Sequence, residues 1–286
     1  MVSFCKLTTF LRGVLKILII GCFLSTDPAI AWNALGHRLI AQVAYDQLDA
    51  ATKKKINYYN HQVNLIYKPS LSFVNAGPWL DGIRDTPGMA RASVHYIDIP
   101  WSLDGTPTRI TPIPNVVTTL EEIIIQLRQS RLSVIEKGIH LRELEHLIGD
   151  LHQPLHAMDG FSQVHPHGDR GGNLFRIRKT PTGGNLHRYW DSGGGLLLFK
   201  KRITHHMLQQ MAKRLEQEWP CQQESNPLAI KQWAQQSHQL AVQKAYTIRE
   251  WSVPSFAYAR QTRVISAQQI VLAGCRLGEL LSLVYN

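Results

Sequence analysis

The chain has 286 residues, of which 44% are apolar and 18% are charged, and its formal net charge is +10 at pH 7. This composition excludes a disordered chain, which would be less apolar, and a protein with many membrane spans, which would be less polar. The length allows one or two domains with a sizeable core. The positive charge suits an anionic partner such as nucleic acid or anionic lipid.

The first 31 residues have the pattern of a secretory signal peptide. Three basic residues precede an apolar run from Ile17 to Leu24, and the triplet Ala29-Ile30-Ala31 follows. This order is typical of a cleaved export signal, and the run is too short for a permanent membrane anchor. We therefore expect residues 1–31 to be removed, the mature chain to begin at Trp32, and the protein to be periplasmic or secreted, without a stable membrane anchor.

Two alternatives exist for this segment, and one for the cysteines. Residues 1–31 could form a buried N-terminal helix, or Cys22 could be lipidated, because Ile19-Ile20-Gly21-Cys22 resembles a lipobox. Cys221 and Cys275 remain after cleavage, and an even pair in an exported protein is a candidate disulfide. Their spacing alone leaves open that they are two buried thiols.

After Trp32, apolar residues recur mostly with helical spacing. We expect helices at 36–50, in two stretches between 118 and 156 broken near Gly138, and at 202–218, 228–250 and 264–284. Thr118 and Glu121 have the spacing of a capping box. Residues 174–178 are the best candidate strand, and clustered glycine and proline predict loops at 100–114 and 181–195. The sequence therefore predicts a single compact all-α domain over residues 32–286.

Histidine and aspartate recur in four short segments. These are Trp32-Asn33-Ala34-Leu35-Gly36-His37, Trp79-Leu80-Asp81 with Arg84 and His95-Tyr96-Ile97-Asp98, His146 to Asp150 continuing to Gln153-Pro154-Leu155-His156, and Asn185 to Asp191. On a helix, His146 lies one turn from Asp150 and His187 one turn from Asp191, so each pair can grip one zinc ion. Such pairs are usually surface ion pairs. Apolar neighbours surround His146 and Asp150, however, and a buried charge needs a partner such as a cation.

These ordered motifs resemble the S1/P1 nuclease family of zinc-dependent single-strand nucleases and 3′-nucleotidases. The resemblance covers essentially all of the predicted mature chain. It implies an all-α fold of the zinc phospholipase C and P1 nuclease type, three Zn²⁺ ions, and a substrate that is single-stranded nucleic acid or a nucleotide. The sequence does not predict an oligomeric partner.

The resemblance also implies the metal ligands. One zinc of a close pair would be held by Asp81, His95 and His146, the second by His156, His187 and Asp191, and a third by His37 and the α-amine and carbonyl oxygen of Trp32, with Asp150 bridging the third and the first. A free α-amine titrates near pH 8, so it can bind metal under mild conditions. Lipidation at Cys22 would leave Trp32 internal and remove this ligand. We also expect Pro154 to kink the chain, which could turn His156 toward the same pocket.

The implied reaction is hydrolysis of a phosphodiester at the P–O3′ bond by a water molecule that the close zinc pair acidifies, which leaves 5′-phosphorylated products. Asp81 would orient this water or accept its proton, Asp150 would bridge two metals, and Arg84 would contact the scissile phosphate. Tyr96 would stack on a base and Asp98 would accept from its exocyclic amine. The alternative for Tyr96 is a residue of the core.

Two parts of the sequence depart from the family pattern. The segment between His156 and His187 is rich in glycine and basic residues, and its His165, His167 and Asp169 could form an extra metal site or simply a solvated loop. Ser192-Gly193-Gly194-Gly195 follows Asp191, where a base-contacting residue would be expected.

Two rival functions remain. A zinc-dependent phospholipase C typically has Glu in place of Asp191, and the basic charge fits a polyanion better than a zwitterionic headgroup. The other rival is a non-catalytic protein that binds zinc or nucleic acid.

Overall fold

The computed structural model of the chain describes residues 32–83, 92–129, 131–199, 202–224 and 226–285. The expected signal peptide, residues 1–31, and the expected phosphate contact, Arg84, lie outside these described residues.

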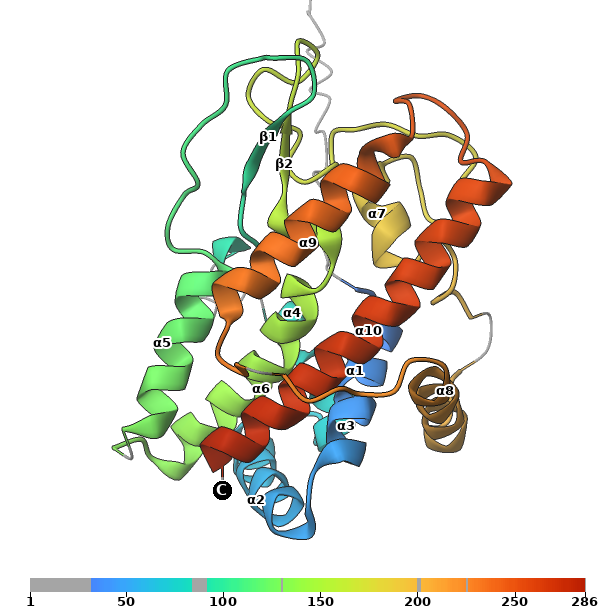
Figure 1. Cartoon of the computed structure of the whole chain (residues 1–286). Coiled ribbons are helices and arrows are strands. Elements are labelled where there is room, and N and C mark those ends of the chain that lie inside the picture. Colours follow the sequence, from blue (N-terminus) through green and yellow to red (C-terminus); the bar gives the residue numbers. More distant parts are fainter. Residues whose placement is uncertain (1–31, 84–91, 130, 200–201, 225, 286) are drawn as a thin grey trace, which may run out of the picture.

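Ten α-helices and three 3₁₀ helices dominate the described residues and confirm the predicted all-α class (Figure 1). In chain order they are α1 (Ala34–Gln47), α2 (Ala50–Ile66), α3 (Phe73–Ala76), α4 (Trp79–Gly82), η1 (Ala92–His95), α5 (Val116–Arg128), α6 (Val134–Leu151), η2 (Pro154–Ala157), α7 (Leu186–Asp191), α8 (His205–Glu218), α9 (Ile230–Lys244), η3 (Ala245–Thr247) and α10 (Phe256–Tyr285). Two short strands, β1 (Pro100–Ser102) and β2 (Asp159–Phe161), pair in parallel with Trp101 opposite Gly160.

Three helices, α1, α6 and α10, form the centre of the fold. Helix α10 runs across the molecule alongside α1 (Figure 1). The two helices approach closely because position 274 is glycine, where a Cβ atom would lie 2.5 Å from Cβ of Val43. Among the described residues, α10 alone is long and apolar enough to cross a membrane, but 78% of its apolar window is buried inside the fold. Such burial is typical of a core helix of a soluble domain.

The predicted helix break near Gly138 is wrong. The break lies between α5, which ends at Arg128, and α6, which begins at Val134 with Ser133 as its N-cap. Gly138 is buried inside α6, and a Cβ atom there would come within 2.5 Å of the carbonyl oxygen of Tyr59 on α2. This glycine therefore permits close packing of two helices and does not interrupt one.

Other boundaries also differ from the prediction. The capping box of α5 uses Asn115 and Thr118, not Thr118 and Glu121. Residues 174–178 are not a strand, because only Arg176 forms a β-bridge there, with Asn185. The expected loops contain β1 and α7. Helix α2 was not predicted because polar residues, among them Asn60 and Asn64, occupy buried positions on its inner face.

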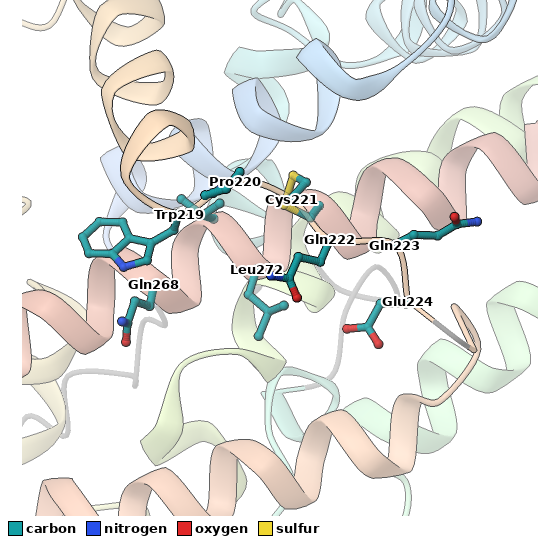
Figure 2. Close-up of a pocket in the computed structure, with 10 residues that line it drawn as sticks. Trp219, Pro220, Cys221, Gln222, Gln223, Glu224, Gln268 and Leu272 are labelled. Atoms are coloured by element: carbon teal, nitrogen blue, oxygen red, sulfur yellow. A yellow bond between two sulfur atoms is a disulfide. The ribbon is translucent and has the colours of Figure 1, made fainter.

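The candidate disulfide between Cys221 and Cys275 is present, and it joins residues 54 positions apart. It ties the segment that follows α8 to the core helix α10. A pocket of about 240 Å³ lies beside it, lined by residues that include Trp219, Gln268 and Leu272 (Figure 2). The disulfide therefore anchors a surface segment that has little secondary structure of its own.

Replacing Cys275 by serine should lower the free energy of unfolding by about 2–4 kcal/mol, because closing a long loop restricts the unfolded chain. Urea unfolding followed by circular dichroism measures this loss. A phosphine reductant should produce a similar loss in the wild type and no further change in Cys275→Ser. An unchanged urea midpoint in the variant would contradict a stabilising role for the disulfide.

Candidate metal centre

Within the described residues, three groups of side chains bring their ligand atoms within 4.8 Å of one another. They are His37 with His146 and Asp150; Asp81 with His95 and His146; and His156 with His187 and Asp191. These residues come from six elements spread over α1 to α7, and nearly all of them are buried. The structure thus brings together every histidine and aspartate that the sequence predicts as a metal ligand.

Asp150 lies between the first two groups. Its Oδ1 is 3.3 Å from Nε2 of His37, whereas its Oδ2 is 2.9 Å from Nδ1 of His95 and 3.3 Å from Nε2 of His146. The two oxygens of one carboxylate therefore face different groups, which is the geometry that a bridging ligand needs.

Glycine on α6 makes room for His37 on α1. A Cβ atom at Gly149 would lie 2.8 Å from Nδ1 of His37. With glycine there, the His37 ring lies between the two helices and stacks on His146, with ring centroids 4.1 Å apart. A larger residue at position 149 would push His37 away from Asp150.

Helix α6 ends at Leu151 and does not kink at Pro154 as expected. The chain turns, and Pro154 begins the short helix η2. This turn brings Nε2 of His156 to 3.1 Å from Nε2 of His187. His156 thus reaches the predicted pocket because α6 ends and a new helix begins, and not because α6 kinks. Proline fits the first turn of a helix better than a helix interior.

Gln153 was not singled out by the sequence, although it stands in the motif before Pro154. Its Oε1 accepts a hydrogen bond from the backbone N–H of Leu155 and its Nε2 donates to Oδ1 of Asp191 at 2.6 Å. One side chain therefore fixes both η2, which carries His156, and the carboxylate of Asp191. The signal available in the sequence was a polar residue directly before Pro154, where a kink was expected.

Backbone carbonyls set the orientation of three histidine rings. The Nδ1 atoms of His146, His156 and His187 lie 2.8, 2.7 and 2.7 Å from the carbonyl oxygens of Gly77, His95 and Gly171. A carbonyl can only accept, so each Nδ1 donates, and a neutral ring then presents the lone pair of Nε2 inward. Metal-bound histidines make the same outer hydrogen bond.

Such inward lone pairs require a cation. The Nε2 atoms of His156 and His187 face each other at 3.1 Å, and Nε2 of His187 is 3.6 Å from Oδ1 of Asp191. Two lone pairs at this separation repel each other unless a proton or a metal ion lies between them. The His37 ring is fully buried, and within the described part of the chain neither of its nitrogens has a hydrogen-bond partner, although Nε2 lies 3.3 Å from Oδ1 of Asp150. Imidazole and carboxylate donors in this number suit zinc, so these residues fit the metal that the motifs imply.

The pKa shifts of Asp191 and His146 also indicate that the three groups attract positive charge. Burial raises the pKa of Asp191, and the carboxylates of Asp81 and Asp150 raise it further. Burial alone would lower the pKa of His146, but Asp150 and Asp81 raise it to about 10. Without metal, a proton would occupy the position on His146 that a bound metal ion would take. The site therefore attracts positive charge, and metal and proton compete for it.

Trp32 is buried directly before α1, the helix that carries His37. The backbone N–H of Asn33 donates to the carbonyl oxygen of Asp191 at 3.1 Å, which joins the start of α1 to the end of α7. The side chain of Asn33 also caps α1. Trp32 thus lies next to α1, which carries His37, and close to the end of α7, which carries His187 and Asp191.

Tyr96 and Asp98 follow His95, and both are half-buried. Their segment is held against η2, since the backbone N–H of Ile97 donates to the carbonyl oxygen of His156 at 2.8 Å. Burial raises the pKa of Asp98 to about 7, and the charges of Asp159 and Asp169 contribute. Asp98 therefore titrates near neutrality.

The possible extra metal site at His165, His167 and Asp169 does not form in the described structure. His165 pairs with Glu250, and His167 lies 2.8 Å from Nη2 of Arg109. Asp169 is buried and accepts a hydrogen bond from the hydroxyl of Tyr246. These three side chains stabilise the loop and do not converge on a common point.

The glycines after Asp191 have a structural role. Gly193, Gly194 and Gly195 all have positive φ angles, between 60° and 95°, which residues other than glycine adopt at a cost. They form a tight turn between α7 and the segment that leads to α8.

Comparison with known proteins agrees with this site. A family model described as S1/P1 Nuclease matches residues 32–286. Endonuclease 3 of Arabidopsis thaliana is 22% identical over 204 residues, which cover 68% of this chain and 65% of the relative. Endonuclease 1 of the same plant is 29% identical over 206 residues, 67% of this chain and 62% of the relative. The chain thus spans less than two thirds of the length of these relatives.

Replacing Asp98 by asparagine should change how stability depends on pH. Between about pH 4 and 7 the folded Asp98 keeps a proton that the unfolded chain loses, so the wild type loses stability as pH rises through this range. The variant lacks this loss. Urea unfolding at pH 5 and at pH 8 should therefore show Asp98→Asn gaining stability relative to the wild type at the higher pH. The same comparison for Asp104→Asn, which removes an exposed carboxyl with a lowered pKa, should show no such gain. If the free energy of unfolding of Asp98→Asn differs from that of the wild type by the same amount at both pH values, the raised pKa of Asp98 is contradicted.

Proposed function

Because the chain belongs to the S1/P1 nuclease family, we propose that it is a zinc-dependent endonuclease. Its substrates would be single-stranded RNA or DNA, and 3′-nucleotides, cleaved at the P–O3′ bond to give 5′-phosphorylated products. The observation that carries this proposal is the convergence of three buried groups of histidine and aspartate, whose donor atoms point at one another.

The donor sets match three zinc ions. Asp81, His95 and His146 would hold the first; His156, His187 and Asp191 the second; and His37 with the α-amine and carbonyl of Trp32 the third, with Asp150 bridging the third and the first. When bound there, zinc ions would acidify a water molecule and stabilise the charge that develops on the departing 3′-oxygen.

The protein side chains then have distinct tasks. Asp81 is the most exposed of the aspartates in the three groups, at 15% of its side chain. Burial alone would raise its pKa, but a hydrogen bond and the positive charge of His146 lower it, so it is ionised at neutral pH. An ionised carboxylate in this place can orient the attacking water or accept its proton. Arg84 follows Asp81 by three residues and would contact the scissile phosphate with its guanidinium fork.

Base recognition would fall to Tyr96 and Asp98. They lie on the segment that is hydrogen-bonded to η2, directly after His95. A base stacked on Tyr96 must be separated from its pairing partner, which favours single strands. A carboxylate at Asp98 would accept a hydrogen bond from an exocyclic amine.

Export fits this chemistry. A disulfide such as Cys221–Cys275 forms and persists in oxidising compartments. Cleavage of the predicted signal peptide after Ala31 would release the amine of Trp32, so that export would complete the metal site. The location would be the periplasm or the exterior.

A zinc-dependent phospholipase C-like activity is the second candidate, because such enzymes share the all-helical fold type and the three-zinc arrangement. Aspartate at position 191 and the basic charge favour the nuclease. A non-catalytic binding protein is disfavoured by the completeness of the donor set.

The test is to assay the zinc-loaded protein on single-stranded RNA and on a choline phospholipid side by side. We expect release of 5′-phosphorylated nucleotides and no release of phosphocholine. Asp150→Asn should lower the nuclease rate by at least about 100-fold, because the bridging carboxylate loses one charge. Glu143→Gln is the matched control, since it changes a half-exposed carboxyl on the same helix.

The outcomes separate the candidates. Hydrolysis of the phospholipid alone would favour the second activity. Three bound zinc ions without turnover of either substrate would favour a binding protein. Near-wild-type hydrolysis by Asp150→Asn, with unchanged helix content, would contradict the bridging role.

A further inference from the structure

Basic side chains gather on two neighbouring segments outside the metal centre. Burial alternates over residues 175–178, with Phe175 and Ile177 buried and with Arg176 and Arg178 exposed. This alternation places both arginines on the solvent side of the segment. Three further exposed cations, Lys179, Arg188 and Arg249, lie on or next to these segments.

Backbone hydrogen bonds join the segments into one unit. The N–H of Trp251 donates to the carbonyl oxygen of Arg176 at 2.6 Å, and the N–H of Arg178 donates to that of Ser252 at 2.8 Å. The side chain of Glu250 accepts from the backbone N–H of Arg176. The connection between α9 and α10 is thereby fixed to residues 176–178, at the end of the molecule opposite α2 (Figure 1).

An aromatic ring stands beside these cations. The side chain of Trp251 is 57% exposed, and the guanidinium of Arg178 lies 5.6 Å from its ring centroid. Its backbone has a φ of 63°, which a bulky residue adopts only where its surroundings enforce it. The hydrogen bond to Arg176 supplies this restraint. The backbone that carries the exposed indole is therefore held in place.

Four cations of this surface lack counter-charges within the described part of the chain. In the described structure, Arg176, Arg178, Lys179 and Arg249 form no salt bridge with an acidic side chain. The nearby acid, Glu250, is half-buried and pairs with His165. Cations held close together without counter-charges repel one another, and a polyanion would relieve this repulsion.

The surface continues from the metal centre. Arg188 is exposed on α7. The same helix carries His187 and Asp191, which are buried and lie one helical turn apart. The N-cap of α7, Asn185, forms a β-bridge with Arg176. A strand bound at the His156–His187–Asp191 group thus lies next to the helix from which the basic surface starts.

We propose that Arg176, Arg178, Lys179, Arg188, Arg249 and Trp251, here called the basic platform, bind the phosphate backbone of single-stranded nucleic acid, with Trp251 stacking on a base. A positive surface combined with an exposed ring is the combination that recognises single strands without regard to sequence. This inference rests on the proposed nuclease function and adds a second contact region, which would make long strands better substrates than short ones.

The test measures binding apart from hydrolysis. The zinc-loaded protein is titrated into a fluorescent oligo(dT) with phosphorothioate linkages, which resist cleavage and keep their charge, and anisotropy is followed over a range of NaCl concentrations. In Arg176→Gln/Arg178→Gln, the slope of log affinity against log salt should fall by about 0.7 for each lost phosphate contact. Trp251→Ala should weaken binding about fivefold or more.

Two controls make the result specific. Lys54→Gln/Lys55→Gln removes two exposed cations on α2 and should leave affinity and slope unchanged. Arg176→Lys/Arg178→Lys keeps the charge and should therefore keep most of the dependence of log affinity on log salt. With a dinucleotide as the substrate, Arg176→Gln/Arg178→Gln and Trp251→Ala should lower kcat/KM less than they do with long single strands.

Wild-type affinity and slope in Arg176→Gln/Arg178→Gln would overturn the proposal. So would a variant that loses binding to phosphatidylglycerol vesicles while its oligo(dT) affinity stays unchanged, because the platform would then serve a membrane surface. Platform-dependent binding by a protein that hydrolyses no nucleic acid would refute the nuclease function and leave this inference standing. Normal hydrolysis with platform-independent binding would refute this inference alone.

Discussion

The mutual approach of buried histidine nitrogens and carboxylate oxygens is the constraint on which the rest of this structure depends. His156 and His187 direct Nε2 at each other because carbonyl oxygens hold their Nδ1 atoms. The two oxygens of Asp150 face His37 on one side and His95 and His146 on the other. Groups arranged in this way are costly to bury without positive charge, so the fold is best understood as a scaffold that keeps a cation-binding arrangement in place.

The surrounding elements maintain this arrangement through close approach. Glycine at position 149 lets α1 bring His37 against α6. The end of α6 at Leu151 and the side chain of Gln153 place η2 and Asp191 together. The packing of α10 on α1 stabilises the helix that carries His37, and the disulfide ties the segment after α8 to α10. The same helix α7 that supplies His187 and Asp191 leads outward to the basic platform, which would link cleavage to the capture of long strands.

Local sequence was enough to predict the helical class, the His-x-x-x-Asp pairs and the disulfide candidate, because each of these depends on spacing along the chain. Long-range packing could not be predicted in the same way. Gly138 reads as a helix breaker, yet it serves the contact of α6 with Tyr59 on α2. Helix α2 was missed because its buried positions include Asn60 and Asn64, whose partner, Arg142, lies about 80 residues away. Gln153 could be noted only as a polar residue before Pro154, since its contact with Asp191 exists only in the folded chain.

The central claim is that three zinc ions occupy these groups together. It is tested most directly by diffraction from crystals of the purified protein at wavelengths on either side of the zinc absorption edge. The account predicts three anomalous peaks: one among Asp81, His95 and His146, one among His156, His187 and Asp191, and one beside His37 and the amino group of Trp32. Fewer peaks in fully active protein, or peaks elsewhere in the molecule, would contradict it.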